Sequence, residues 1–279
     1  MIDDSTCPLY AWYGFPHLPN APKAPKAYEI CQDDRPDSPD LPDSPYPYVL
    51  CMLLGGVYAW SLLLRLAQWY VRRTYPNVSI KVAYDISKNM VHHVNAMVCV
   101  ATMSPAFINN VTDIYANRIV CGGIIASFAF YLYDTACILW SLKQSLNIPY
   151  LVHHVVTMMW LWYAWNGFHR EVILYVVYLL EYSNFLLYVS YHLRKVYPEY
   201  TALQMVSECF QLVWYGYFRV IRLSIFLFQV RTALFTQVFT SLLCSVMFVI
   251  LYAMGLYWTC NLWKKCAKHV QRGGGASSS

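Results

Sequence analysis

The sequence predicts an all-α multi-pass membrane protein, and three observations lead to that prediction. Hydrophobic residues fill 58% of the 279 positions and charged residues only 13%, whereas about 25% of a typical soluble domain is charged. Apolar runs of the roughly 20 residues that a helix needs to cross a bilayer recur along the chain, with short polar breaks between them. Lys and Arg concentrate in alternate breaks. Together these observations predict seven transmembrane helices.

The apolar runs differ in how well they fit a membrane-spanning helix. They occupy residues 47–71, 88–107, 119–141, 149–168, 171–193, 203–229 and 233–263. The run at 88–107 is the weakest, because polar groups lie in its first turns and Pro105 lies near its end. The fourth run carries two adjacent histidines and the sixth carries two arginines. Ionisable residues inside a membrane helix are costly and by default mark a functional interior.

The two ends of the chain differ from the apolar part. Residues 1–46 hold eight of the fifteen acidic residues and the proline-rich stretch "RPDSPDLPDSPYP", and they contain no apolar run. Such a segment cannot bury enough surface to fold alone, so an irregular tail is expected. Residues 47–79 then form the first helix and its connection. Residues 269–279 form a C-terminal tail that closes with "GGGASSS", which is typical of a linker.

Basic residues set the predicted orientation. They follow the first, third, fifth and seventh helices, at Arg72, Arg73, Lys81, Lys143, Arg194, Lys195, Lys264, Lys265 and Lys268. The N-terminus is therefore expected in the lumen and the C-terminus in the cytosol. Asn110 then lies in a lumenal glycosylation sequence, and Cys7 and Cys31 share a compartment in which they could pair.

Ionisable and polar residues inside the predicted helices agree in depth. Arg65 and Glu208 lie near cytosolic helix ends, where long side chains reach the interface. At about 1.5 Å per residue, Asp134 lies roughly 10 Å from the cytosolic end of its helix, and His153 and His154 lie about one turn inside theirs. The remaining ionisable residues of the set, from three further helices, are His92, His93, Glu181, Arg219 and Arg222. A structural alternative stays open, in which Glu181 and Arg219 form a neutralising pair between two helices.

The histidine pair suggests two kinds of chemistry. A neutral imidazole with a carboxylate behind it can act as a general base or as an acyl-accepting nucleophile, and Asp134 is the natural orienting partner. Adjacent helical residues point about 100° apart, so we expect one imidazole to face the interior and the other a neighbouring helix. Thr157 follows His153 by four residues and His154 by three, so its hydroxyl lies on the helix face that carries the imidazoles. A zinc site is the competing possibility.

Several stretches resemble the TLC family, the membrane domain shared by ceramide synthases and the translocation-associated TRAM proteins. The resemblance lies in "YDTACILWSLKQSLNIPYLVHHVVT", "LLEYSNFLLYVSYHL", "YFRVIRLSIF" and "LYAMGLYWTCNLWKKCAK". It implies that residues 80–268 form a six-helix bundle around a lipid-accepting cavity in the endoplasmic reticulum membrane, with one extra N-terminal helix. The helix after the histidine pair offers Glu181 where ceramide synthases have an aspartate, so the chain is more similar to the smaller TLC-domain proteins.

The resemblance also implies a function. In ceramide synthases the paired histidines pass an acyl chain from acyl-CoA to the amine of a long-chain base. This implies catalytic roles for His153, His154, Asp134 and Glu181, and substrate contacts from His92, His93, Asn95, Thr157, Ser183, Arg219 and Arg222. No cofactor and no metal ligand are expected, with acyl-CoA as co-substrate. The expected partners are membrane lipids, acyl-CoA and a long-chain base, but no nucleic acid; a homodimer is left open. The alternatives are a non-catalytic lipid-binding, lipid-sensing or cargo-trafficking protein, and a zinc-dependent lipid hydrolase.

Overall fold

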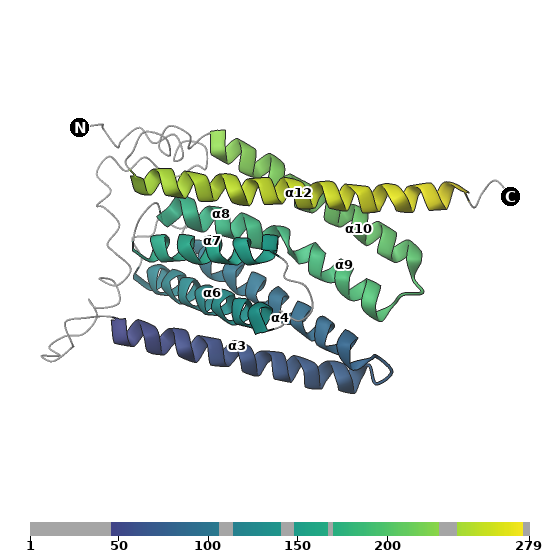
Figure 1. The fold of residues 1–279 in the computed structure, drawn as a ribbon, viewed down its shortest axis with the longest axis horizontal. Coiled ribbons are helices and arrows are strands. Elements are labelled where there is room, and N and C mark those ends of the chain that lie inside the picture. The colour runs from purple at the N-terminus through teal and green to yellow at the C-terminus, as the bar shows by residue number, and fades with distance from the viewer. Residues whose placement is uncertain (1–45, 106–113, 141–147, 167–169, 229–238, 276–279) are drawn as a thin grey trace, which may run out of the picture.

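A computed structural model describes residues 46–105, 114–140, 148–166, 170–228 and 239–275. Within these ranges the regular structure is entirely helical, which confirms the predicted all-α class (Figure 1). The helices are α3 (Tyr46–Thr74), α4 (Ile80–Met103), α6 (Ile114–Trp140), α7 (Ile148–Trp165), α8 (Arg170–Ser183), α9 (Phe185–Val196), α10 (Thr201–Gly216), the π-helical segment η3 (Tyr217–Arg222) and α12 (Phe239–Gly275). Residues 1–45 of the predicted N-terminal tail, with Cys7 and Cys31, and Asn110 lie outside the described residues. Residues 269–275 of the predicted C-terminal tail belong to α12.

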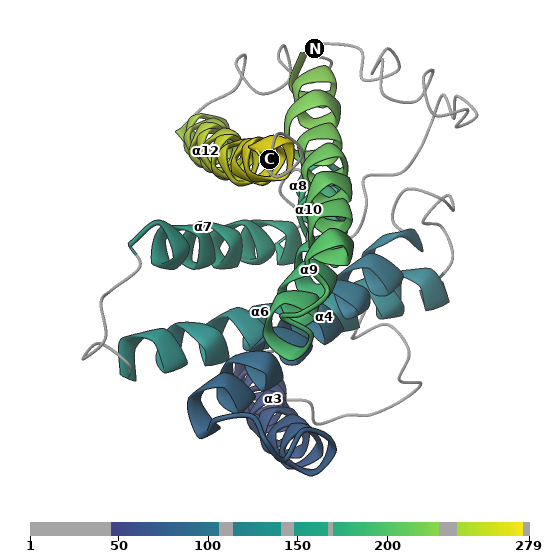
Figure 2. The ribbon, with the colours of Figure 1, turned by 90° about the vertical axis from the view of Figure 1, so that its right-hand side faces the viewer.

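The helices form one elongated bundle. The helices lie side by side, with α3 at one edge and α10 and α12 at the opposite edge, and α9 continues the line of α8 (Figures 1 and 2). Helix α6 packs against α3, α4 and α7, and α8 packs against α4 and α7. The bundle interior is therefore lined mainly by α4, α6, α7 and α8, from which most of the predicted site residues come.

Four of the predicted spans are long and apolar enough to cross a membrane. They are Pro47–Thr74, Arg118–Trp140, Arg170–Val196 and Ser245–Lys268. The other three predicted spans correspond to α4, to α7 and to α10 with η3, which fall below the same limits in the part of the chain that the structure describes. These three helices carry all four predicted histidines and both predicted arginines of the site.

Helix boundaries differ most from the predicted ones at the start of α4 and at the end of α12. Helix α4 begins at Ile80 instead of residue 88, because Ser79 caps it by accepting a hydrogen bond from the backbone N–H of Val82 at 3.4 Å. His92 therefore lies about 18 Å from the start of its helix instead of in the first turns. Helix α12 continues to Gly275, well beyond the predicted end at residue 263.

The break between α8 and α9 packs against the π-helical segment η3. Helices α8 and α9 are separated at Asn184, whose N–H donates to the oxygen of Glu181 at 3.0 Å, one residue short of the usual helical spacing. The carbonyl oxygen of Leu180 then accepts from Ser183 Oγ at 2.6 Å and from Arg219 Nη2 at 3.1 Å. Arg219 belongs to the π-helical segment, and such segments occur frequently at functional sites.

Two adjacent glycines of α3 provide a test of the packing. A Cβ atom on Gly56 would lie 2.7 Å from the Cβ of Ala129 on α6, whereas a Cβ on Gly55 would have no atom within 4 Å. We expect Gly56→Ala to destabilise the bundle by about 1–3 kcal/mol through overpacking. We expect Gly55→Ala to stabilise it by up to about 1 kcal/mol through the lower backbone entropy of alanine. Thermal unfolding in detergent measures both, and equal shifts would contradict this packing.

Candidate functional site

Asp134 of α6 is the centre of a buried polar cluster. Its side chain is 1% exposed and lies close to three basic groups from two other helices. Lys88 Nζ lies 3.0 Å from Oδ1, His92 Nε2 lies 3.3 Å from Oδ2, and His154 Nε2 lies 3.6 Å from Oδ2. None of the three approaches is aligned as a hydrogen bond, so the cluster is held by charge and proximity. The predicted meeting of α6 and α7 side chains is thus present in the structure.

His154 is oriented from both of its ring nitrogens. Besides the approach of Nε2 to Asp134, its Nδ1 lies 3.4 Å from the hydroxyl oxygen of Thr135. The ring packs against Tyr150 and Tyr131, at centroid distances of 4.5 and 5.2 Å. Tyr150 also hydrogen-bonds to His92, with its hydroxyl 3.0 Å from Nδ1. These contacts fix the orientation of the His154 ring toward α6.

His153 faces a different part of the interior. Its ring contacts Trp258 of α12 edge-on, at a centroid distance of 5.8 Å. Its Nδ1 is buried and has no hydrogen-bond partner among the described residues. The expected divergence of the two imidazoles is therefore seen: His154 turns to the carboxylate on α6 and His153 turns to α12. Both side chains are buried.

A second polar network lies at the break between α8 and α9. Arg219 donates from Nε to Ser183 Oγ at 2.8 Å and from Nη2 to Asn184 Oδ1 at 3.1 Å. Asn184 Nδ2 in turn lies 3.4 Å from Glu181 Oε2. The described contacts include no direct ion pair between Glu181 and Arg219; the Asn184 amide lies between them. The pairing of these two residues is thus indirect.

Tyr131 of α6 joins the two networks. Its hydroxyl donates to Glu181 Oε1, and its ring contacts both His153 and His154 edge-on, at 6.1 and 5.2 Å between centroids. The side chains of Asp134, the histidine pair, Tyr131, Glu181 and Arg219 therefore form one continuous interior assembly. All of them are buried.

The other predicted site residues lie nearby or apart. His93 stacks on Tyr188 at 5.3 Å between centroids. Asn95 is buried, and its side-chain oxygen lies 3.9 Å from the Cys99 sulfur. The Thr157 hydroxyl donates to the backbone oxygen of His153 at 2.8 Å, so it supports the helix rather than the ring. Arg222 donates to the hydroxyl of Tyr175 at 3.0 Å.

The prediction that Glu208 reaches the membrane interface is wrong. Glu208 is 3% exposed, and its carboxylate pairs with Arg194 of α9 at 3.2 Å. The buried position is possible because the partly exposed Arg194 supplies the opposite charge. Arg65 is exposed, as predicted.

Sequence reasoning missed several residues of the assembly. They are Lys88, Tyr131, Thr135, Tyr150, Asn184 and Trp258. One signal for Lys88 was present, because it precedes His92 by four residues and so shares its helical face. The tyrosines and Trp258 gave no signal in a chain with 25 tyrosines and 10 tryptophans.

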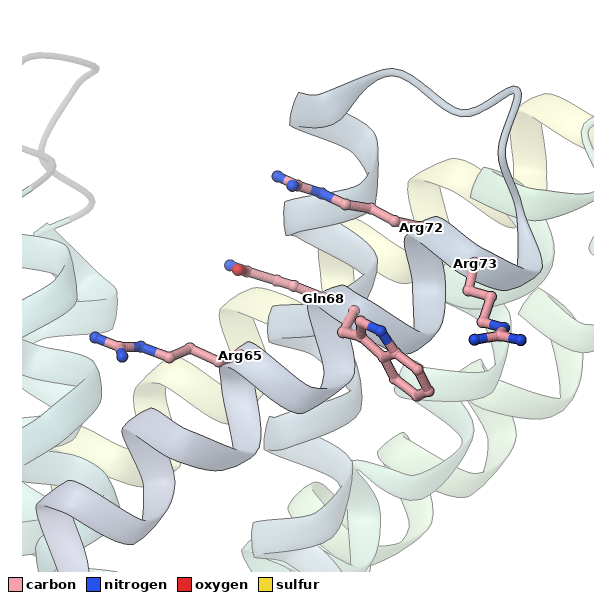
Figure 3. A pocket seen from close by; sticks show the side chains of 5 residues that line it. Arg65, Gln68, Arg72 and Arg73 are labelled. Atoms are coloured by element: carbon pink, nitrogen blue, oxygen red, sulfur yellow. The ribbon is translucent and has the colours of Figure 1, made fainter.

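A surface pocket lies on α3, away from the buried assembly. The pocket is formed by Arg65, Gln68, Trp69, Arg72 and Arg73 on α3, where Arg65, Gln68 and Arg72 point to one side and Arg73 to another (Figure 3). The Arg73 guanidinium lies 5.5 Å from the centre of the Trp69 ring. In the ranges that the structure describes, no group of three His, Cys, Asp or Glu side chains is arranged to hold a metal ion.

The fold and the site define a helical membrane protein with a buried assembly of histidines, carboxylates and an arginine in its interior. A family model of the TLC domain matches residues 109–264, more than half of the chain. The chain therefore belongs to the TLC-domain family, as its motifs suggested, and it is a lipid-related membrane protein. Lys88 and His92 lie before the matched segment. Searches of curated proteins and of solved structures give no match to this chain.

Proposed function

We propose that the protein is an acyl-CoA-dependent N-acyltransferase of ceramide-synthase type, which joins an acyl chain to the amine of a long-chain base. One observation carries the proposal. His154 is held by Asp134 at 3.6 Å, while the adjacent His153 keeps a buried Nδ1 without a partner in the described part of the chain. A nucleophilic imidazole needs such an unoccupied ring nitrogen. Membership in a lipid-related family supports an acyl substrate.

The proposed reaction has two steps. In the tautomer with its proton on Nε2, His153 attacks the thioester carbonyl carbon through Nδ1, the carbon–sulfur bond breaks, and the ring proton passes to the departing thiolate. CoA leaves as a thiol and a neutral N-acyl imidazole remains. The amine of the long-chain base then attacks the same carbon, the carbon–imidazole bond breaks, and the ring recovers a proton from the amine. Asp134 orients His154 beside this centre, and Glu181 acts as a further acid or base through Tyr131.

The proposed setting is the endoplasmic reticulum membrane. All seven predicted helices would cross it, with the N-terminus in the lumen and the C-terminus in the cytosol. Lys88 supports access from the cytosolic end, because its side chain is 30% exposed while it contacts the buried carboxylate of Asp134. In this orientation the histidine pair would lie on the side of the membrane where acyl-CoA is available.

The test is CoA release by the purified protein. Palmitoyl-CoA and sphinganine are supplied together, and free thiol and N-acyl product are measured. We expect both to rise in equal amounts. A non-catalytic lipid-binding protein would release no CoA and would retain intact lipid in native mass spectrometry. A zinc hydrolase would release a fatty acid without an amine and would lose that activity with a chelator. Either result would overturn the proposal.

A further inference from the structure

We propose that Nη1 of Arg219 binds the carbonyl oxygen of a long-chain acyl group, in a site that Arg219 and His153 form around Trp258. This inference rests on the proposed function in one respect, because it assigns the acyl group of the same substrate to a specific donor. The ligand class is an ester, thioester or amide with a long alkyl chain. The binding itself requires no catalysis.

The hydrogen bonds of Arg219 leave one edge of its guanidinium open. The side chain is 2% exposed. Nε donates to Ser183 at 2.8 Å, and Nη2 donates to Leu180 and Asn184, both at 3.1 Å. Nη1 is buried and has no partner within the described ranges. A buried charged donor without an acceptor lowers the stability of the folded protein. An oxygen atom of a ligand that accepts from Nη1 would remove this unfavourable free energy.

The Arg219 guanidinium and the His153 ring both contact the same side chain, Trp258. Trp258 contacts both groups: the Arg219 guanidinium carbon lies 5.6 Å from the centre of its ring, and the His153 ring centroid lies 5.8 Å from it. Tyr215 packs against the guanidinium at 4.8 Å. A carbonyl bound here would place its oxygen near Nη1 and its carbon toward His153. The donor would then stabilise the oxygen as negative charge develops on it.

The charges at the site favour an uncharged acceptor group next to Nη1. The positive charge of Arg219 is already opposed by Glu181, to which Asn184 connects it. A free carboxylate or a phosphate would add a negative charge to an interior where Glu181 and Asp134 are also buried, and an uncompensated buried charge is strongly unfavourable. A carbonyl adds an acceptor without a net charge.

The test compares two neutral ligands that differ in one carbonyl. Ethyl palmitate and ethyl hexadecyl ether, both radiolabelled, are titrated into the wild-type protein in detergent. We expect the ester to bind about tenfold or more tighter than the ether, which is the effect of one hydrogen bond to a charged group. Equal affinities of the two ligands in the folded wild-type protein would overturn the inference without any variant.

Variants then assign the effect to Arg219. Arg219→Gln should remove the preference for the ester, so that both ligands bind alike. Arg170→Gln is the matched control, since Arg170 is also buried but contacts Cys121 at 3.5 Å on another part of the bundle; it should keep the preference. An ester preference that survives Arg219→Gln would also overturn the inference. Because neither ligand releases CoA, these results are independent of whether the protein catalyses acyl transfer.

Discussion

Replacing His153 with alanine is expected to abolish CoA release and N-acyl product formation, by about 10³-fold or more. The physical reason is that alanine removes the ring nitrogen that would accept the acyl group, and no other imidazole can replace it. His154 cannot take over without leaving Asp134 and Thr135, which lie 3.6 and 3.4 Å from its two ring nitrogens. Initial rates of thiol release with palmitoyl-CoA and sphinganine measure the effect.

His192→Ala is the control for this variant. His192 lies in α9 and contacts Tyr75 and Tyr197, at centroid distances of 6.1 and 6.4 Å, away from the buried assembly. We expect it to keep the wild-type rate. If a folded His153→Ala protein still turned over at the wild-type rate, His153 would not be the acyl acceptor.

Replacing Asp134 with asparagine should reduce both stability and activity. The carboxylate lies between Lys88, His92 and His154, at 3.0, 3.3 and 3.6 Å. Asparagine has nearly the same shape but no charge, so it leaves the basic groups without their counter-charge. Breaking a buried ion pair costs about 3–5 kcal/mol, although the partly exposed Lys88 can recover some solvation. We expect a clear fall in the thermal unfolding midpoint and roughly a hundredfold loss of turnover, because His154 is no longer oriented.

Two variants separate these effects. Asp85→Asn removes a carboxylate from α4 outside the cluster and should change neither property by much. Lys88→Met together with Asp134→Asn removes both charges and should recover stability but not turnover. A double variant that recovered full turnover would show that Asp134 serves only the fold. An Asp134→Asn protein as stable and active as the wild type would contradict the assigned cluster.

The helical class and the meeting of Asp134 with His154 were predictable from the sequence. Composition and the length of the apolar runs determine the helical class. The meeting of Asp134 with His154 followed from depth, because residues at equal distances from the same membrane surface can meet in a bundle. The absolute depth of His92 was wrong, since Ser79 starts α4 eight residues before the predicted position. His92 still reaches Asp134, because the extra turns of α4 precede it.

The second network was not predictable in detail. Its geometry depends on the break at Asn184 and on the π-helical segment that contains Arg219, and both depend on contacts between residues distant in the chain. Local sequence preferences contain no information on such contacts. Glu208 shows the same limit, because its burial depends on Arg194 from a neighbouring helix.

The most direct test of the account is to locate the acyl group on the protein. The protein is incubated with palmitoyl-CoA without an amine, digested, and analysed by peptide mass spectrometry. We predict a palmitoyl adduct on His153. When sphinganine is added, the adduct disappears and an equal amount of N-acyl product forms. No adduct on His153, or an adduct on another residue that sphinganine consumes, would contradict it.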